Sequence, residues 1–213
     1  MENITDRKTE ISKVFIWFGV VVLIISMIDI FDILFPLRLS SPEWVFVTTQ
    51  GIVTSILAPA LAIILILAGF YINKNSVTNK KGLIFEQILS FGSFILMLCI
   101  AGNLLIYSLS IKAYETNAVS SIKSQKESAL SKLEEIKNSG QINVAEEVFE
   151  QKIAEINRAA SQQIESTKKQ ILKRNIKVIV EMILYILLYL MIGKIAYQSS
   201  RSNLLKLKFV NKQ

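Results

Sequence analysis

Two aspartates three residues apart, Asp29 and Asp32, are the side chains whose position points most directly to chemistry. They lie in the outer half of a long apolar segment, and their spacing places both carboxylates on one helical face. Carboxylates at membrane depth are costly and usually face a bundle interior, a cation or water. The pair predicts an intramembrane polar site, which serves either as a proton or ion relay or as two groups hydrated at the outer interface. No other apolar segment carries a central carboxylate or a buried base to complete a pathway, which favours hydration.

Metal and cofactor chemistry finds little support in the residue types of the chain. Paired aspartates can hold magnesium, but such sites need several oxygen ligands, and the only other aspartate is Asp6. Histidine is absent and Cys99 is the single cysteine, which excludes structural zinc, histidine-ligated haem and Cys-His catalysis. We therefore expect no catalytic residue, no metal site, no cofactor and no enzyme activity. Cys99 is predicted to be a small packing residue, and Glu86 to be hydrated near the end of its apolar run.

The elements that must position these residues are long apolar runs. A helix needs about 20 residues to cross roughly 30 Å of hydrocarbon, and four runs are long enough. Because a spanning segment must satisfy every backbone polar group internally, each run is predicted to be a helix. The sequence predicts an all-α polytopic membrane protein with four transmembrane helices. The runs are Val14 to Phe35, Gly51 to Ile72, Leu83 to Tyr107 and Ile176 to Tyr197.

Proline and small residues predict how the spans end and pack. Ser41 followed by Pro42 is typical of a helix start, and Pro59 predicts a kink within the second run. Small residues favour close helix packing in lipid. The second run offers a small surface and the third run a matching one, which predicts a packed bundle. The residues are Ala58, Ala60, Ala62 and Gly69 in the second run, and Ser90, Ser93, Ala101 and Gly102 in the third.

A charged insert separates the third and fourth runs. It has no proline and a single glycine, Gly140, which predicts two helices over about 107–137 and 144–174. Asn143 and Glu146 are spaced as a helix start. Apolar residues at helical spacing predict an antiparallel coiled coil continuous with the adjoining spans, although a merely solvated helical connection is the alternative. The predicted seam comprises Val119, Ile122, Ala129, Leu133 and Ile136, interrupted by Lys126, and Phe149, Ile153, Ile156, Ala160, Ile164 and Ile171, with Thr167 between them.

These elements divide the chain into five parts. We expect a cytoplasmic tail over 1–13, a three-helix transmembrane region over 14–107, an extramembrane helical hairpin over 108–175, a fourth transmembrane helix over 176–197 and a basic cytoplasmic tail over 198–213. The net charge of +7 does not indicate nucleic acid, because basic residues gather beside the spans or alternate with glutamate. Anionic lipid headgroups account for them more simply.

Basic residues in the short segments predict that both termini are cytoplasmic. Ten lie in the two tails and the second loop, whereas the first loop has only Arg38. A cluster from Lys168 to Lys177, at the outer end of the fourth span, opposes this orientation, but long loops are partly exempt from the rule. The ten are Arg7, Lys8, Lys13, Lys74, Lys80, Lys81, Arg201, Lys206, Lys208 and Lys212.

The amino-terminal half resembles the cyanobacterial HpsJ-like membrane proteins of the hormogonium polysaccharide locus type. The resemblance rests on Phe35-Pro36-Leu37, Ser41-Pro42-Glu43-Trp44, Ala58-Pro59-Ala60-Leu61 and Gly69-Phe70-Tyr71. It implies a fourth span after a long helical insert, and a role at loci for secreted polysaccharide and surface-dependent motility without assigned catalytic residues. The chain departs from the family after the mid-span proline, where Ala60-Leu61-Ala62 replaces an expected leucine and glycine.

These observations favour a non-enzymatic scaffold that supports an envelope polysaccharide export or processing complex through its hairpin. The alternatives are an assembly factor for photosynthetic or respiratory complexes, and a small transporter or proton-linked subunit that uses Asp29 and Asp32. Expected partners are the lipid bilayer, membrane proteins that bind the hairpin, and a second copy in a homo-oligomer. The expected location is the plasma (inner) or thylakoid membrane.

The predicted orientation can be tested by thiol labelling in a Cys99→Ser background. Ser139→Cys should react with an impermeant reagent applied from the extracytoplasmic or lumenal side, and Asn203→Cys should not, because four spans return the chain to its starting side. The reverse pattern would show that the cluster from Lys168 to Lys177 sets the orientation.

Overall fold

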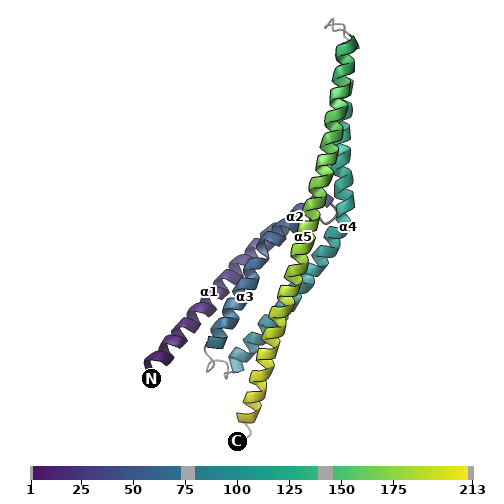
Figure 1. The fold of residues 1–213 in the computed structure, drawn as a ribbon. Coiled ribbons are helices and arrows are strands. Elements are labelled where there is room, and N and C mark those ends of the chain that lie inside the picture. Colours follow the sequence, from purple (N-terminus) through teal and green to yellow (C-terminus); the bar gives the residue numbers. More distant parts are fainter. Residues whose placement is uncertain (1, 73–79, 139–145, 211–213) are drawn as a thin grey trace. The chain divides into compact units, whose positions relative to one another are not determined.

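The computed structural model describes residues 2–72, 80–138 and 146–210, with side chains described over 7–72, 82–138 and 146–204 (Figure 1). Five helices form within these ranges: α1 (Glu2–Leu34), α2 (Pro42–Ser55), α3 (Leu57–Ile72), α4 (Lys80–Asn138) and α5 (Glu146–Val210). No strand occurs among the described residues, so the all-α prediction is confirmed. The turn predicted at Gly140 and the start predicted at Asn143 lie outside the described residues.

Four helical segments are long and apolar enough to cross a membrane, as the sequence predicts. They are Arg7–Leu34, Pro42–Ile72, Gly82–Asn138 and Glu146–Leu204. The second segment begins nine residues before the predicted Gly51, because Ser41 caps α2 by accepting a hydrogen bond from the backbone N–H of Trp44 (3.3 Å), with Pro42 in the first turn. Residues 2–13 and 198–210 are helical extensions of α1 and α5, so both predicted tails are mostly helix.

The chain divides into two compact units, which are described separately. Unit 1 comprises Met1–Tyr107 with Val178–Gln213, and unit 2 comprises Ser108–Lys177. Unit 1 therefore contains α1, α2, α3 and the apolar parts of α4 and α5. Unit 2 contains the charged parts of α4 and α5.

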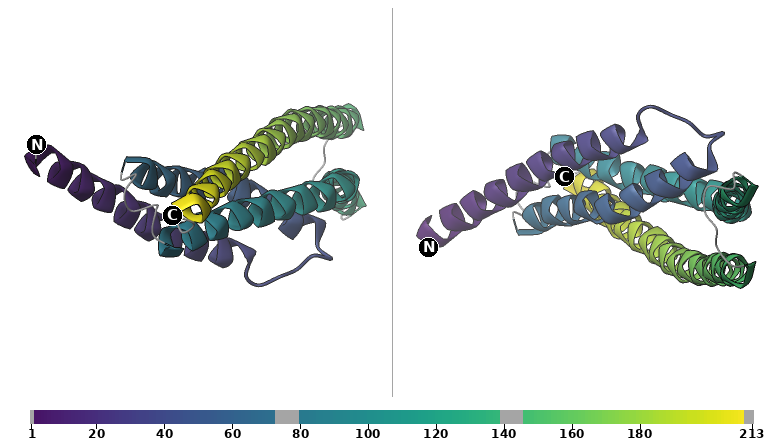
Figure 2. Two further views of the ribbon diagram at one scale, coloured as in Figure 1. Left: turned by 90° about the horizontal axis from the view of Figure 1, so that it is seen from below. Right: turned by 90° about the horizontal axis from the view of Figure 1, so that it is seen from above.

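In unit 1, α1 and α3 pack side by side in close backbone contact (Figures 1 and 2). A Cβ atom built on Gly19 would lie 2.8 Å from the Ala62 carbonyl oxygen, and one built on Gly69 would lie 2.9 Å from the Ser12 carbonyl oxygen. The Ser12 hydroxyl donates to the Gly69 carbonyl at 2.8 Å. Since lipid provides no hydrophobic force between helices, such close packing and interhelical hydrogen bonds hold them together.

At four of the eight small residues, the structure differs from the matching of small surfaces predicted between the second and third runs. Ala62 and Gly69 face α1, at Gly19 and Ser12. On the third run, Ser90 instead donates to a carbonyl of α5, and a Cβ atom on Gly102 would meet no atom within 4 Å. Small residues predict that a helix can be approached closely, but they carry no information about which neighbour approaches.

The second span breaks at Ile56, three residues before Pro59. Proline lacks a backbone N–H and its ring crowds the preceding turn, so the helix cannot continue regularly across it. The carbonyl of Ile56 accepts a hydrogen bond of 2.8 Å from the Tyr189 hydroxyl of α5. Tyr189 is fully buried, and its bond supplies the broken turn with a partner. The structure therefore places the predicted kink between α2 and α3.

In unit 2, α4 and α5 run antiparallel beside each other (Figure 1). Near the distal end, Lys137 on α4 pairs with Glu146 on α5, and the Lys137 ammonium lies 5.9 Å from the ring centroid of Phe149. Four apolar side chains, Ile122, Phe149, Ala160 and Ile171, are buried. These contacts form a helical hairpin whose helices are each continuous with the adjoining apolar run.

The seam of the hairpin is narrower than the sequence predicts. Ala129, Ile136 and Ile153 are exposed, while Leu130 and Lys126 are half-buried. A pair of helices covers only a thin stripe of each partner, so apolar residues at the flanks of the stripe stay at the surface. Val119, Leu133, Ile156, Ile164 and Thr167 are half-buried, as members of a two-helix seam should be.

The α1–α3 contact predicts a sharp difference between two glycine substitutions. Gly69→Ala should destabilise the protein by about 1–3 kcal/mol, because its methyl group would press against a backbone oxygen that moves only if the helices separate. Gly102→Ala is the matched control: its methyl group enters open space, so the higher helix propensity of alanine should make it neutral or stabilising. Thermal unfolding of the full chain in detergent measures both, and equal effects would contradict this account of the contact.

Candidate functional site

Asp29 and Asp32 are both exposed on α1, away from the packed core of unit 1. In the described part of the chain neither carboxylate has a hydrogen-bond or ion-pair partner, and no group of three His, Cys, Asp or Glu residues gathers there to hold a metal. A shallow hollow on the same stretch of α1 is lined by apolar residues: Leu23, Ile24, Met27, Ile28 and Phe31. The pair stays a predicted polar site, and no described residue completes a pathway with it.

A different carboxylate, Glu86, is buried in unit 1. It is 2% exposed, so the prediction that Glu86 is hydrated near the end of its apolar run is wrong. Its two oxygens accept hydrogen bonds from α5: one from the Ser199 hydroxyl (3.1 Å) and one from the Asn203 side-chain amide (3.2 Å). Buried carboxylates are tolerated when hydrogen bonds replace their hydration. The spacing of four between Ser199 and Asn203 puts both donors on one face of α5.

The sequence contains little evidence that Glu86, Ser199 and Asn203 form a cluster. Ser199 and Asn203 lie in the segment predicted to be a tail, and serine and asparagine are common in tails. The signal that could have found them is their spacing of four in a segment that continues the helix of the fourth span. Only the continuation of α5 past residue 197 brings them opposite Glu86.

The cluster joins two helices and carries no catalytic arrangement. Nucleophilic catalysis by serine needs a base that can take the hydroxyl proton and access for a substrate. Here the Ser199 hydroxyl donates to a carboxylate that is almost fully covered. A second bond between the same helices, from the Ser90 hydroxyl to the Gly193 carbonyl (2.9 Å), is also buried. Glu86, Ser90, Ser199 and Asn203 thus fasten α4 to α5 within unit 1.

Unit 1 contains a further polar contact between α2 and α4. The Thr49 hydroxyl donates to the side-chain oxygen of Asn103 at 3.0 Å. The rings of Phe46 and Tyr107 stack nearby in sequence, with centroids 5.6 Å apart. Thr49, Phe46 and Tyr107 are all buried, so this contact is also structural.

Cys99 and Asn203 need corrected roles. Cys99 is exposed, so the prediction that it is a small packing residue is wrong. Asn203 is engaged with Glu86, which makes it a poor position for an introduced thiol. Ser202 is exposed and one residue away, so Ser202→Cys is the better labelling position for the carboxyl-terminal segment.

The described part of unit 2 has a large accessible polar surface. Exposed ion pairs link Lys152 to Glu155 and Lys169 to Glu165, both at 2.7 Å. The hydrogen bond from Lys169 raises its own pKa and lowers the pKa of Glu165, and Lys152 likewise lowers the pKa of Glu155. These pairs are solvated and contribute little to stability. They place charges of both signs along the exposed surface of α5.

No family model, curated protein or solved structure matches the chain.

The Glu86 cluster predicts a graded effect of substitutions. Glu86→Ala should lower the free energy of unfolding by about 1–3 kcal/mol, because Ser199 and Asn203 would lose their buried acceptor. Glu86→Gln keeps one acceptor oxygen and the side-chain shape, so its effect should be smaller. Glu127→Ala, on the exposed surface of the hairpin, is the control and should leave unfolding unchanged. The order is read from thermal unfolding in detergent, and a wild-type value for Glu86→Ala would contradict the role of Glu86.

Proposed function

We propose that this protein is a non-enzymatic membrane scaffold that binds partner proteins through the hairpin of unit 2. The observation that carries the proposal is the separate compact unit Ser108–Lys177, a self-packed pair of long helices between two apolar segments. A simple connection between two spans requires only a few residues. A hairpin of this length with its own buried seam offers two extended helical faces to other proteins.

The distal part of the hairpin has the chemistry of a partner-binding surface. Val148 is 44% exposed and Ile153 is 37% exposed, although both are aliphatic. They stand among charged residues, including Glu147, Glu150 and Lys152, all of them exposed. Apolar contacts surrounded by charges are typical of interfaces between helical proteins, in which the apolar residues contribute affinity and the charges contribute specificity.

The nature of the partner follows from the resemblance and the orientation expected from the sequence. The resemblance to HpsJ-like proteins suggests a complex that exports or processes envelope polysaccharide. Cytoplasmic termini would place the hairpin on the extracytoplasmic or lumenal side of the plasma (inner) or thylakoid membrane, where such a complex releases its product. The scaffold would then hold the complex together on the export side.

Photo-crosslinking from the hairpin tests the proposal. A crosslinking amino acid at Val148 of the full chain in its native membrane should capture one or a few membrane proteins. The same amino acid at Ile122, which is buried in the seam, should capture little, because partners cannot reach it. Leu184, 57% exposed on α5 in unit 1, controls for collisions within the bilayer.

The identity of the captured proteins then decides the role. Glycosyltransferases or polysaccharide export components would support the proposal. Photosynthetic or respiratory subunits alone would overturn it in favour of an assembly factor. Equal, weak capture at Val148 and Ile122 would overturn a hairpin scaffold of either kind.

A further inference from the structure

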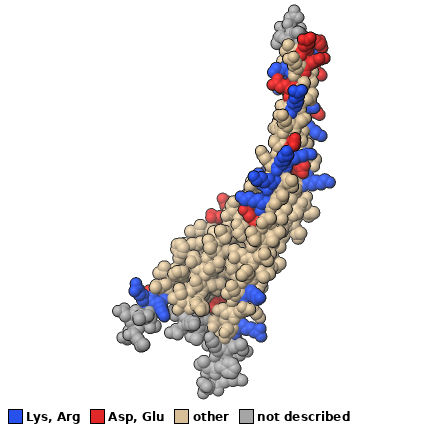
Figure 3. Space-filling model, viewed as in Figure 1, with Lys and Arg blue, Asp and Glu red and all other residues tan. Residues whose placement is uncertain are grey.

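The charge of unit 2 is divided unevenly along its length. The end nearest the apolar segments, residues 108–122 and 159–177, holds six basic and two acidic residues. The distal remainder, residues 123–158, holds six basic and seven acidic residues. Figure 3 shows blue side chains gathered toward one end of this unit and red ones toward the other. The hairpin is thus strongly basic at one end and nearly neutral over the rest.

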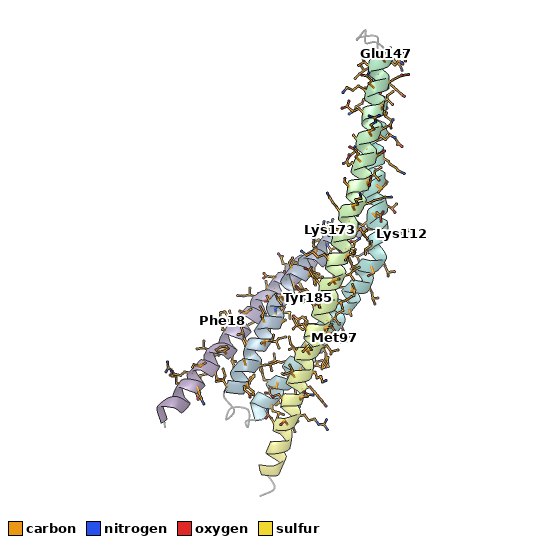
Figure 4. All side chains as sticks on the ribbon, viewed as in Figure 1. Phe18, Met97, Lys112, Glu147, Lys173 and Tyr185 are labelled. Carbon is orange, nitrogen blue, oxygen red and sulfur yellow. The ribbon has the colours of Figure 1, made fainter. Side chains whose placement is uncertain are left out.

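The six basic residues form what we call the basic collar: Lys112, Lys168, Lys169, Lys173, Arg174 and Lys177. They come from both arms, and Figure 4 shows Lys112 of α4 and Lys173 of α5 at the same end of the hairpin, with Glu147 at the other. Five of the six are exposed, and Arg174 is half-buried. Within the collar, Lys169 is bonded to Glu165 at 2.7 Å.

Large aliphatic side chains are exposed among the collar residues. Leu109 on α4 is 83% exposed, and Leu172 and Ile176 on α5 are 61% and 56% exposed. Leu172 and Ile176 are four residues apart, so they form one stripe, with Lys168 one turn further along it. If this end of the hairpin faced water, its exposed side chains would be expected to be polar.

A surface that mixes exposed aliphatic and basic side chains fits the boundary between hydrocarbon and headgroups. Aliphatic side chains there enter the acyl region, while lysine extends its apolar stem along it and holds its ammonium among the phosphates. Four collar residues of α5 directly precede its apolar run in the sequence and Lys177 lies at the start of the run, which puts them within a few turns of hydrocarbon. A soluble polyanion would satisfy the lysines but would leave Leu109, Leu172 and Ile176 in water.

From the exposed aliphatic and basic side chains at this end of the hairpin, we propose that the basic collar is a binding site for the phosphate headgroups of anionic phospholipids. Clusters of basic residues beside a membrane span attract anionic lipids over zwitterionic ones, because each added positive charge strengthens binding to a negative surface. The site would hold the end of the hairpin that carries the collar against the headgroups. It does not depend on the scaffold function, because lipid binding needs no protein partner.

Native mass spectrometry of the detergent-solubilised full chain tests the site. With equal phosphatidylglycerol and phosphatidylcholine added, the wild-type protein should retain phosphatidylglycerol with a preference of about tenfold or more. Replacing Lys168, Lys169 and Lys173 with Gln should remove most of this preference. Replacing the same three residues with Arg should preserve it, because the charge remains.

The hairpin supplies a matched control in Lys123, Lys132 and Lys152. In each set of three exposed lysines, one is bonded to a glutamate: Lys169 to Glu165 in the collar, and Lys152 to Glu155 in the control. Replacing the control lysines with Gln removes the same charge from the distal part and should leave the preference intact. Circular dichroism checks that each variant stays helical. A second measurement needs no variant: the preference of the wild-type protein for phosphatidylglycerol should fall as salt is added, because salt screens exposed charges.

Several results would overturn the proposal. One is an equal retention of the two lipids by the wild-type protein, and another is an equal loss of preference in the control variant. Displacement of the lipid by soluble glycerol phosphate at equal concentration would show a site for free phosphate. Binding of alginate without any lipid preference would assign the collar to an acidic polysaccharide.

Discussion

Hydrocarbon offers no hydrogen bonds, so each backbone or side-chain polar group that leaves water within a span must find its partner in the protein. Three hydroxyl-to-carbonyl bonds show how unit 1 meets this constraint. Ser12 donates to the Gly69 carbonyl, Ser90 to the Gly193 carbonyl and Tyr189 to the Ile56 carbonyl. The first two bonds each join two helices, and the third joins α5 to the break between α2 and α3. Each acceptor lies where the backbone is accessible. Glycine has no Cβ to shield its carbonyl, and Ile56 lies at the break before Pro59.

The same constraint explains why α1 and α3 approach so closely. Apolar side chains gain nothing by leaving lipid for one another, so dispersion and direct bonds must hold the helices. Gly19 and Gly69 allow the two backbones to come within contact of each other, and Ser12 adds a bond at the same place. The opposite face of α1 keeps Trp17, Phe18 and Ile28 exposed, as a helix surrounded by lipid requires. Asp29 and Asp32 depart from this pattern and stay the unexplained polar residues of α1.

Unit 2 differs from unit 1 in that its exposed surface is largely polar and charged. Its narrow seam buries Ile122, Phe149, Ala160 and Ile171 by the ordinary hydrophobic effect, and the exposed ion pairs add little. Two helices alone bury little apolar surface, so such a hairpin is well suited to gain stability from whatever binds it. This would hold for the proposed protein partner at the distal end and for the proposed lipid headgroups at the collar.

The sequence alone determined the helical class, four candidate spans, the cap at Ser41 and the hairpin, because run length, proline placement and helical spacing are local properties. Tertiary structure alone decided which helix met which. The small residues of the second span predicted close packing, yet only the fold showed that Gly69 meets Ser12. Glu86 became a buried group because α5 stays helical through Ser199 and Asn203, residues 113 and 117 positions away in the chain. Burial depends on neighbours brought together from distant positions, and no local pattern encodes them.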